Sequence, residues 1–257
     1  MHLSINVNTF ISVFYKIQKL LFILLVFFSA TAYGEEEDEF ESFSKAITKN
    51  NTAINDPFET YNRKIYKFND VVDKYFLEKI ATGYRFVTPK PVRNSITNFI
   101  NNLSLPISAV NSVMQGKVDN SLATTSTFLI NSTIGIFGLF DVAGQKKITY
   151  QPEDFGQTFA VYGLKSSPFL MLPLLGPSTV VDFSGSIANR IVSPTDFDML
   201  NFSLLDSNQR ALISATSIVN NREQLLDIIK DIRQNSFDSY AIIRSAYLQR
   251  RINQINN

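Results

Sequence analysis

Apolar residues between positions 58 and 75 recur at alternating spacings of three and four, which is the period of an amphipathic helix. They are Phe58, Tyr61, Ile65, Phe68, Val72 and Tyr75. The preceding Asp56-Pro57-Phe58-Glu59 is typical of a helix start, with a capping acid, an early proline and a further acid. Asn62, Arg63 and Asn69 interrupt the polar side. The pattern predicts a packed helix of about five turns, and we prefer packing to a ligand site as the role of its aromatic residues.

Prolines divide the next part of the chain into three predicted helices. Pro89 and Pro91 begin the first of them, Pro106 begins a second that ends near Gly116, and Lys117 begins a third. The apolar face of the first consists of Val92, Ile96, Phe99, Ile100 and Leu103. These spacings predict further amphipathic helices.

The stretch from Asn120 to Phe140 contains no charged residue, which matches the length of a membrane span. It is nevertheless polar, through Ser121, Thr124, Thr125, Ser126, Thr127, Asn131, Ser132 and Thr133. Such side chains can bond their own helix backbone or line a wet passage. We therefore prefer a buried helix to a passage wall, and both to a lipid-exposed span. Gly135 and Gly138 lack the spacing and context of a phosphate-binding loop.

The stretch from 150 to 185 combines a short helix with a punctuated apolar passage. Pro152, Glu153 and Asp154 are expected to open the helix, because proline wastes no donor there and acids meet the positive end of the dipole. Residues 159–162 and 169–172 are short and apolar, and a turn at 163–168 separates them. This predicts a hairpin-like loop with apolar arms.

Helical patterns return after this loop. A helix containing Asp182 is predicted from 177 to 191, and from about Asn208 onward the chain is almost entirely helical. Asp238 is expected to cap the last helix. Arg250 and Arg251 lie in its C-terminal part, where the helix dipole favours cations. No strand-rich region or repeat is present in the sequence. The predicted fold class is therefore all-α with irregular apolar loops.

The N-terminal segment has the pattern of an export signal. Lys16 and Lys19 precede an apolar run at 20–28, and small residues follow at 30–34, so residues 1–34 are predicted to be a cleavable signal peptide; an uncleaved anchor is the alternative. Six of the seven residues at 35–41 are acidic, so 35–54 is expected to be a disordered leader. The folded domain is expected at 55–252, with a tail at 253–257.

Composition excludes several classes of chemistry. Charged residues make up 18%, and 22 of 257 residues are Phe. Without residues 1–34 the chain has 22 bases against 23 acids, so no basic surplus indicates nucleic acid. The chain has no Cys, and its single histidine, His2, lies in the predicted signal. We therefore expect no metal site built on Cys or His, no cofactor and no His-dependent triad.

Six phrases in order carry a resemblance to a known family. They are Asp56-Pro57-Phe58-Glu59-Thr60-Tyr61-Asn62-Arg63 with Phe68-Asn69, Asn102-Leu103-Ser104-Leu105-Pro106 with Gln115-Gly116, Asn131-Ser132-Thr133-Ile134-Gly135 with Gly138 and Asp141-Val142-Ala143, Glu153-Asp154-Phe155-Gly156-Gln157-Thr158, Leu172-Pro173-Leu174-Leu175-Gly176-Pro177-Ser178, and Asp238-Ser239-Tyr240 with Arg244, Tyr247-Leu248-Gln249 and Arg251. Over about residues 55–252 the chain closely resembles the VacJ, or MlaA, family of outer-membrane phospholipid-transport proteins.

The resemblance implies a ring-like single domain of helices around a central amphipathic passage, lying in the inner leaflet of the outer membrane. Such proteins remove phospholipids from the outer leaflet and pass them to a soluble periplasmic carrier, in complex with a trimeric porin. The apolar hairpin would border and gate the passage. The expected passage and gate residues are Phe159, Tyr162, Leu164, Phe169, Met171, Leu172, Leu174, Thr133, Gly135 and Gly138. The expected structural motif is Asp56, Pro57, Asn62, Arg63, Asn69, Glu153, Asp154, Gly156, Gln157, Gly176 and Pro177.

Two departures from the family pattern stand out. The family is usually anchored by a lipidated N-terminal cysteine, and this sequence has none. We therefore expect attachment at the periplasmic face of the outer membrane without a lipid on Cys, through apolar loops, the porin or an uncleaved signal. Val181 stands where family members often carry Arg before Asp182.

Two other functions remain as alternatives to a non-enzymatic lipid conduit. A periplasmic hydrolase would use Glu153 and Asp154 with Asp182 or Asp141. Against it, adjacent acids on a helix point about 100° apart, and helix capping explains them without chemistry. A structural scaffold or adhesin would use the same apolar loops.

Overall fold

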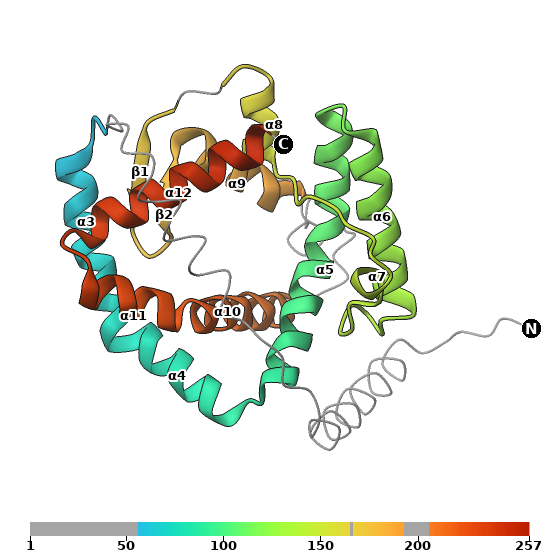
Figure 1. The fold of residues 1–257 in the computed structure, drawn as a ribbon, viewed down its shortest axis with the longest axis horizontal. Helices are drawn as coiled ribbons and strands as arrows, with labels where there is room; N and C mark the ends of the chain where they lie inside the picture. Colours follow the sequence, from blue (N-terminus) through green and yellow to red (C-terminus); the bar gives the residue numbers. More distant parts are fainter. Residues whose placement is uncertain (1–55, 165–166, 193–205, 257) are drawn as a thin grey trace, which may run out of the picture.

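A computed structural model describes residues 56–164, 167–192 and 206–256 of the chain. The predicted signal peptide and the whole acidic leader lie outside the described residues. Helices dominate the described part, and Figure 1 shows most of them following one another around a ring. This confirms the predicted fold class, with one short two-stranded hairpin as the exception.

The left side of the ring in Figure 1 is one long helical element. Helix α3 (Glu59–Val72) continues through a π-helical turn, η1 (Asp73–Leu77), into α4 (Glu78–Val87). The Asp56 carboxylate accepts a hydrogen bond from the Phe58 amide, 3.1 Å away, just before the helix begins. The helix thus starts where the sequence predicts and extends about three turns beyond the predicted end.

Helices α5 (Lys90–Met114) and α6 (Val118–Thr133) form an antiparallel pair, with α6 and the short α7 (Val142–Gln145) outside the ring. The prediction that Pro106 begins a new helix is wrong, because α5 runs through it. A proline in a helix interior costs about 3 kcal/mol. Buried residues on both sides of it, from Asn102 to Ser108, pack within the structure and hold the two halves in line.

The predicted apolar hairpin forms from different arms. Residues 155–161 are helix α8 (Phe155–Val161), which a capping box between Asp154 and Gln157 starts. The cap is therefore Asp154, two residues later than the predicted Pro152 opening. Strand β1 (Phe169–Leu172) pairs instead with β2 (Gly176–Thr179), antiparallel, with Leu172 opposite Gly176. The short turn works because Leu174 and Gly176 adopt positive φ angles of 63° and 85°.

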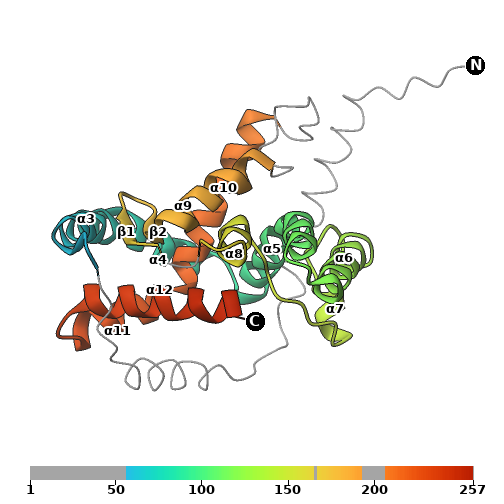
Figure 2. The same ribbon diagram turned by 90° about the horizontal axis from the view of Figure 1, so that it is seen from above.

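The remaining helices complete the ring. Helix α9 (Val180–Val192) follows the hairpin, so the helix predicted from 177 begins three residues later. Helices α10 (Ser207–Gln224), α11 (Leu226–Asn235) and α12 (Ser239–Asn256) follow residues that the structure does not describe. Seen edge-on, α11 and α12 form a layer on one side of the ring (Figure 2).

A small aromatic core fastens the hairpin between α3 and α12. Phe169, Met171 and Tyr240 are at most 2% exposed, and Ile65, Tyr66, Tyr247 and Leu248 pack against them. Phe169 meets Tyr240 edge-on, with ring centroids 6.2 Å apart. The apolar strand β1 is thus core along one face.

Helices α8 and α9 cross at two glycines. A side chain on Gly185 would place its Cβ 2.2 Å from the backbone nitrogen of Gly156, a distance that no real contact allows. We expect Gly185→Ala to lower the free energy of unfolding by about 1–3 kcal/mol through overpacking. Urea unfolding followed by circular dichroism measures this change.

Gly83→Ala is the matched control, because Gly83 lies inside α4 and a Cβ there would meet nothing within 4 Å. It should stabilise the protein by about 0.4–1 kcal/mol, since alanine has less freedom to lose on folding. Equal destabilisation by both variants would contradict the close crossing of α8 and α9.

Candidate functional site

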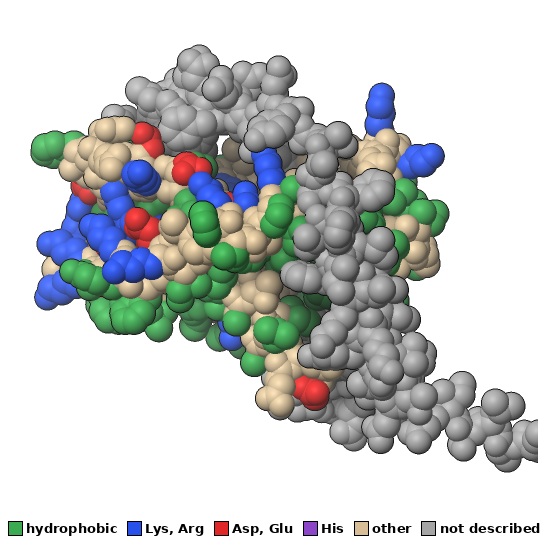
Figure 3. Space-filling model, turned by 90° about the horizontal axis from the view of Figure 1, so that it is seen from below, with side chains coloured by type: hydrophobic (Ala, Val, Ile, Leu, Met, Phe, Trp, Pro, Cys, Tyr) green, Lys and Arg blue, Asp and Glu red, His purple; other side chains and the backbone are tan. Residues whose placement is uncertain are grey.

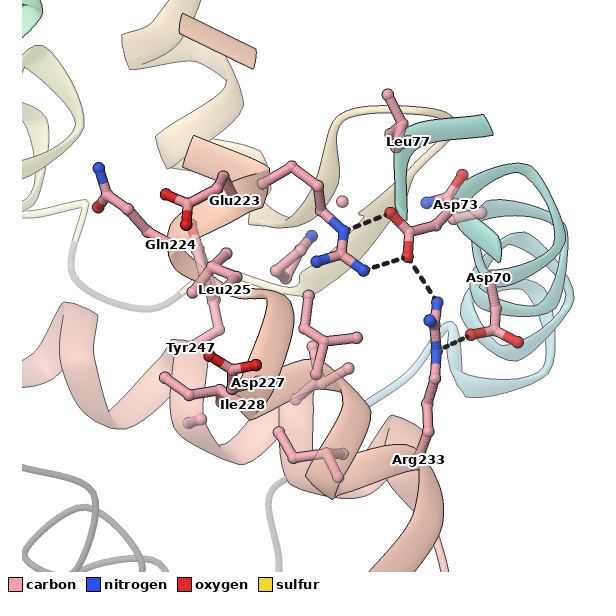
Figure 4. A pocket seen from close by; sticks show the side chains of 18 of the residues that line it. Asp70, Asp73, Leu77, Glu223, Gln224, Leu225, Asp227, Ile228, Arg233 and Tyr247 are labelled. Carbon is pink, nitrogen blue, oxygen red and sulfur yellow. Dashed lines mark hydrogen bonds and ion pairs between the residues drawn. The ribbon is translucent and has the colours of Figure 1, made fainter. Parts of the chain in front are cut away.

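A cavity of about 1330 Å³ lies among the hairpin, η1, the start of α5, and α10 to α12. Its size exceeds the roughly 300–1000 Å³ of ordinary small-molecule sites. Figure 4 shows residues from α11, α12 and the α10 end converging on it from one side and those of α3 and η1 from the other. Segments far apart in the sequence therefore share one large hollow.

One wall of the cavity is apolar. The hairpin contributes Met171 and the turn from Leu174 to Pro177, and α11 contributes Ile228, Ile229 and Ile232. Leu174 and Leu175 are each 64% exposed, so the tip of the hairpin is open to the cavity and to its surroundings. An apolar wall of this kind suits hydrocarbon.

A charged group, here called the charged wall, centres on Asp73 in the π-helical turn and shares α11 with the isoleucines, through Asp227 and Arg233. Its two carboxylate oxygens lie 2.6 and 2.8 Å from the Arg222 guanidinium, and one of them also lies 2.7 Å from Arg233 (Figure 4). Arg233 further pairs with Asp70 and Glu78, at 2.7 and 2.6 Å. Burial alone would raise the pKa of Asp73, but the two arginines outweigh it and lower the pKa.

A second ionic group continues the charged wall toward α5. Arg85 lies 2.6 Å from Glu223 and 2.8 Å from Asp227, and Arg93 lies 3.2 Å from the same Glu223 oxygen. Burial lowers the pKa of Arg85 by itself, but its hydrogen bonds to Asp227 and Glu223 reverse the sign and raise it. Arg85 therefore keeps its charge at neutral pH.

The hairpin edge is bound by two asparagines of α3. Asn62 donates to the Phe169 carbonyl at 3.1 Å and accepts from the Met171 amide at 2.8 Å. Asn69 donates to the Leu172 carbonyl at 2.9 Å and accepts from the Leu174 amide at 2.8 Å. Both belong to the predicted structural motif, and their amide groups bond the hairpin instead of solvent; Asn69 also lines the cavity, whereas Asn62 is fully buried.

The acids proposed for the alternative hydrolase are each engaged in packing interactions. Glu153 is fully buried beside Lys117 at 2.7 Å. Asp154 and Asp182 both pair with Arg251, and Tyr247 donates to Asp182 at 2.6 Å. Burial is the main cause that raises the pKa of Tyr247, and the hydrogen bond to Asp182 raises it further. This cluster ties α8, α9 and α12 together, and Gly156 leaves it room.

The other motif residues join the start of α3 to α12. The Asp56 carboxylate accepts hydrogen bonds from Tyr240 and Arg244, while Arg63 grips Asp238 with contacts of 2.7 and 3.1 Å. Arg63 lowers the pKa of Asp238. Pro57 is exposed just before α3. Gly176 and Pro177 begin β2 and line the cavity.

The structure brings only part of the predicted passage and gate set together. Met171 and Leu174 line the cavity, while Phe169 is core and Leu172 is half-buried beside them. Phe159 is half-buried in α8, and Tyr162 and Leu164 are exposed after it. Thr133, Gly135 and Gly138 lie at the far side, around the α6–α7 loop, and none of them lines this cavity.

The cavity residues that the sequence analysis missed are mainly the ionic ones. Arg222, Arg233, Asp70 and Asp73 come from helices about 150–160 positions apart, so no local pattern pairs them. Arg222 and Asp227 are charges on ordinary amphipathic helices, and only proximity in the fold makes them a wall. Within the described residues, no helix is both long and apolar enough to span a bilayer, and no cluster of His, Cys, Asp and Glu could hold a metal.

The charged wall predicts a specific acid sensitivity. The pKa of Asp73 is lowered in the fold. Its ion pairs therefore contribute their full stability to the folded state above its ordinary pKa near 4, and this stability is lost as pH falls below that value. We expect Asp73→Asn to lower the free energy of unfolding by about 3–5 kcal/mol at neutral pH, because it breaks a buried pair. The variant should also lose less stability than the parent between pH 5 and about 3.

Asp227→Asn is the control, because its side chain is 80% exposed although it also pairs with an arginine of the wall. It should cost at most about 1 kcal/mol and leave the acid sensitivity unchanged. Unfolding by urea at several pH values measures both variants, and parallel pH curves for Asp73→Asn and the parent would rule out the assigned role of Asp73.

Comparisons with known proteins agree with this architecture. The model of the family described as "MlaA lipoprotein" matches residues 54–254. The chain is 33% identical over 199 residues to the intermembrane phospholipid transport system lipoprotein MlaA of Escherichia coli K12, covering 76% of each chain. It is 36% identical over 199 residues to an uncharacterised protein of Rickettsia bellii, covering 77% of this chain and 76% of the relative.

These descriptions correct one expectation. The family and its characterised relatives are lipoproteins, which implies a lipid anchor through cysteine. The expected attachment to the outer membrane without such an anchor is therefore wrong. It rested on the lack of Cys in the 257 residues, and that composition does not decide how a member of this family is held.

A solved structure extends the agreement to the fold. It is described as "Structural basis for maintenance of bacterial outer membrane lipid asymmetry" and superposes with a TM-score of 0.68 at 35% identity. The match covers 79% of this chain and all of the solved chain. The overall fold thus recurs in a solved structure of related sequence, and the chain belongs to the MlaA lipoprotein family.

Proposed function

We propose that this protein transports phospholipids and thereby maintains the lipid asymmetry of the outer membrane, without catalysing a reaction. The names of the relatives and the description of the solved structure ascribe that activity to those proteins. One observation in this chain supports it most directly: the distribution of polar and apolar side chains is reversed relative to an ordinary soluble fold.

The reversal is clearest in the α5–α6 pair. Its buried positions are mostly small or polar and include Ser108, Asn111, Ser112, Ser121, Thr124, Thr127 and Asn131. Its exposed positions include Val113, Leu122 and Leu129, at 60%, 62% and 56% exposure. Helices in lipid pack through small and hydroxyl residues and turn their apolar side chains outward. This pair therefore fits a surface solvated by acyl chains.

The outer face of α3, η1 and α4 follows the same rule. Phe68, Tyr75, Phe76 and Phe86 are between 49% and 90% exposed. Figure 3 shows hydrophobic side chains gathered along one edge of the described surface, beside a band of charged ones. Burying roughly 400 Å² of such surface in acyl chains would contribute about 10 kcal/mol before ordering costs. We propose that this surface rests among lipid chains.

The cavity fits the cargo of such a protein. Its apolar wall suits acyl chains and its charged wall suits a polar headgroup, so a phospholipid could cross without exposing either part to the wrong surroundings. We propose that the cavity is part of the passage and that the β1–β2 hairpin borders and gates it through Leu172 and Leu174. Because Phe169 and Met171 are both core, the gating part is the tip and not the whole apolar arm.

The proposal includes two protein partners: a trimeric porin beside the ring, and a soluble carrier that receives the lipid. It does not include hydrolysis. Asp154 and Asp182 both pair with Arg251, and Glu153 pairs with Lys117, so each has a structural role.

A complementation experiment tests the proposed function. Residues 54–254 would be joined to the leader and lipid-bearing cysteine of the recipient's own protein and expressed in a bacterium that lacks that protein. If the protein removes phospholipid from the outer leaflet, the amount of phospholipid there should return to the level of the parental bacterium. Correctly exported and folded protein that leaves this level unchanged would contradict the proposal.

The lipid-facing surface gives a quantitative prediction. Leu122→Glu with Leu129→Glu should weaken partition of the purified protein into phospholipid vesicles by at least about a hundredfold, because burial of each leucine contributes about 1.5–3 kcal/mol. Vesicle flotation measures the bound fraction.

The control adds the same charge elsewhere. Gln234→Glu with Asn253→Glu changes two exposed polar positions on α11 and α12 and should leave flotation nearly unchanged. If both pairs lower flotation equally, net charge and not the α6 surface governs membrane binding.

A further inference from the structure

The free edge of β1 is bonded by a helix instead of a third strand. Two side-chain amides of α3 bond this edge as the backbone of a third strand would. Asn62 bonds the residues on either side of Leu170, and Asn69 bonds the residues on either side of Pro173; Leu170 and Pro173 are here called the spanned residues. Each donates to the carbonyl before the spanned residue and accepts from the amide after it. Four backbone groups of the hairpin thus bond to two side chains.

The spacing of the two asparagines matches the strand. Seven helical residues advance about 10.5 Å in two turns, which returns to nearly the same face. The three residue steps from Leu170 to Pro173 advance about 10 Å in extended chain. A helix and a strand therefore run in register over this distance, which requires asparagines at positions 62 and 69 together.

The two contacts differ in burial. Asn62 is fully buried and also donates to Asp56 at 3.0 Å, so it is fixed within the core of the fold. Asn69 is only half-buried and holds the tip of the hairpin. Removal of the Asn62 contact should therefore destabilise the whole fold, whereas removal of the Asn69 contact should loosen only the hairpin tip.

The tip that Asn69 holds is strained. Leu174 has a φ of 63°, a left-handed conformation that bulky side chains rarely adopt. Its amide is the donor to Asn69, and Leu174 with its neighbours up to Pro177 lines the cavity. Strain of this kind persists only where surrounding contacts impose it, and it is concentrated at clamps and switch segments.

We propose that Asn69 is a positioning residue that latches the hairpin tip against α3 and so controls the width of the cavity mouth, while Asn62 is the fixed pivot. Release of the latch lets Leu174 relax and swings Leu174 and Leu175 away from the cavity. The inference rests on the proposed function, because a latch matters only if lipid passes the tip.

Asn69→Ala tests the contact directly. Loss of two side-chain hydrogen bonds should raise hydrogen exchange of the Leu174 amide on the order of tenfold. Exchange of the Met171 amide, which Asn62 holds, should not change. Equal acceleration at both amides would mean that the whole hairpin has loosened, and it would overturn the division into latch and pivot.

Asn120→Ala is the matched control. Asn120 also makes a pair of hydrogen bonds to a backbone segment: it donates to the Gln151 carbonyl at 2.9 Å and accepts from the amide of the same residue at 2.7 Å. Gln151 does not line the cavity. In full-length protein reconstituted in phospholipid vesicles, Asn69→Ala should raise the rate of labelled-phospholipid transfer, and Asn120→Ala should not. Equal effects of the two would reduce Asn69 to a structural residue.

A reversible lock completes the test. Because the 257 residues contain no Cys, Asn69→Cys with Leu174→Cys introduces a unique pair. Oxidation should slow phospholipid transfer severalfold, and reduction should restore it. If the parent chain transfers lipid and the oxidised variant transfers it equally fast, the latch alone is overturned. A parent chain that transfers none would overturn the proposed function, and the latch with it.

Discussion

The structure depends on satisfying polar groups inside a molecule that exposes many large hydrophobic side chains. Among the described residues, 18 buried side chains are polar or charged and 11 are hydrophobic. The hydrophobic effect of water alone cannot hold such a ring together, because much of its apolar area faces outward. Cohesion comes instead from hydrogen bonds and ion pairs in a medium where an unpaired polar group is costly.

Arginines join segments that are distant along the chain. Arg233 connects α11 to α3, η1 and α4, and Arg251 connects α12 to α8 and α9. Planar guanidinium groups suit this role, because one side chain can bind two or three carboxylates at fixed angles. Closing the ring in this way leaves the middle hollow. Arg233, one of the residues that secure the ring, also makes part of the cavity lining charged.

The hairpin completes the amphipathic character of the site. Its buried face belongs to the aromatic core with Tyr240, and its tip reaches the cavity with two exposed leucines. One short element thus combines a rigid base with an apolar edge at the hollow. The asparagines of α3 make this possible, since they satisfy a strand edge that would otherwise need another strand or water.

The sequence by itself determined what local chemistry decides. The spacing of apolar residues after Asp56 predicted α3, the acids before Phe155 predicted a capped helix, and the ordered motifs identified the family. Interactions between distant residues were beyond it. Short apolar runs such as 169–172 suit helix or strand equally, so the partner of β1 depended on the turn at Leu174 and Gly176. Pro106 suggested a break, but packing around it overrode that local preference. Which arginine meets Asp73 was settled only by the tertiary structure, because ion pairing depends on distance in space and leaves no periodic trace in the chain.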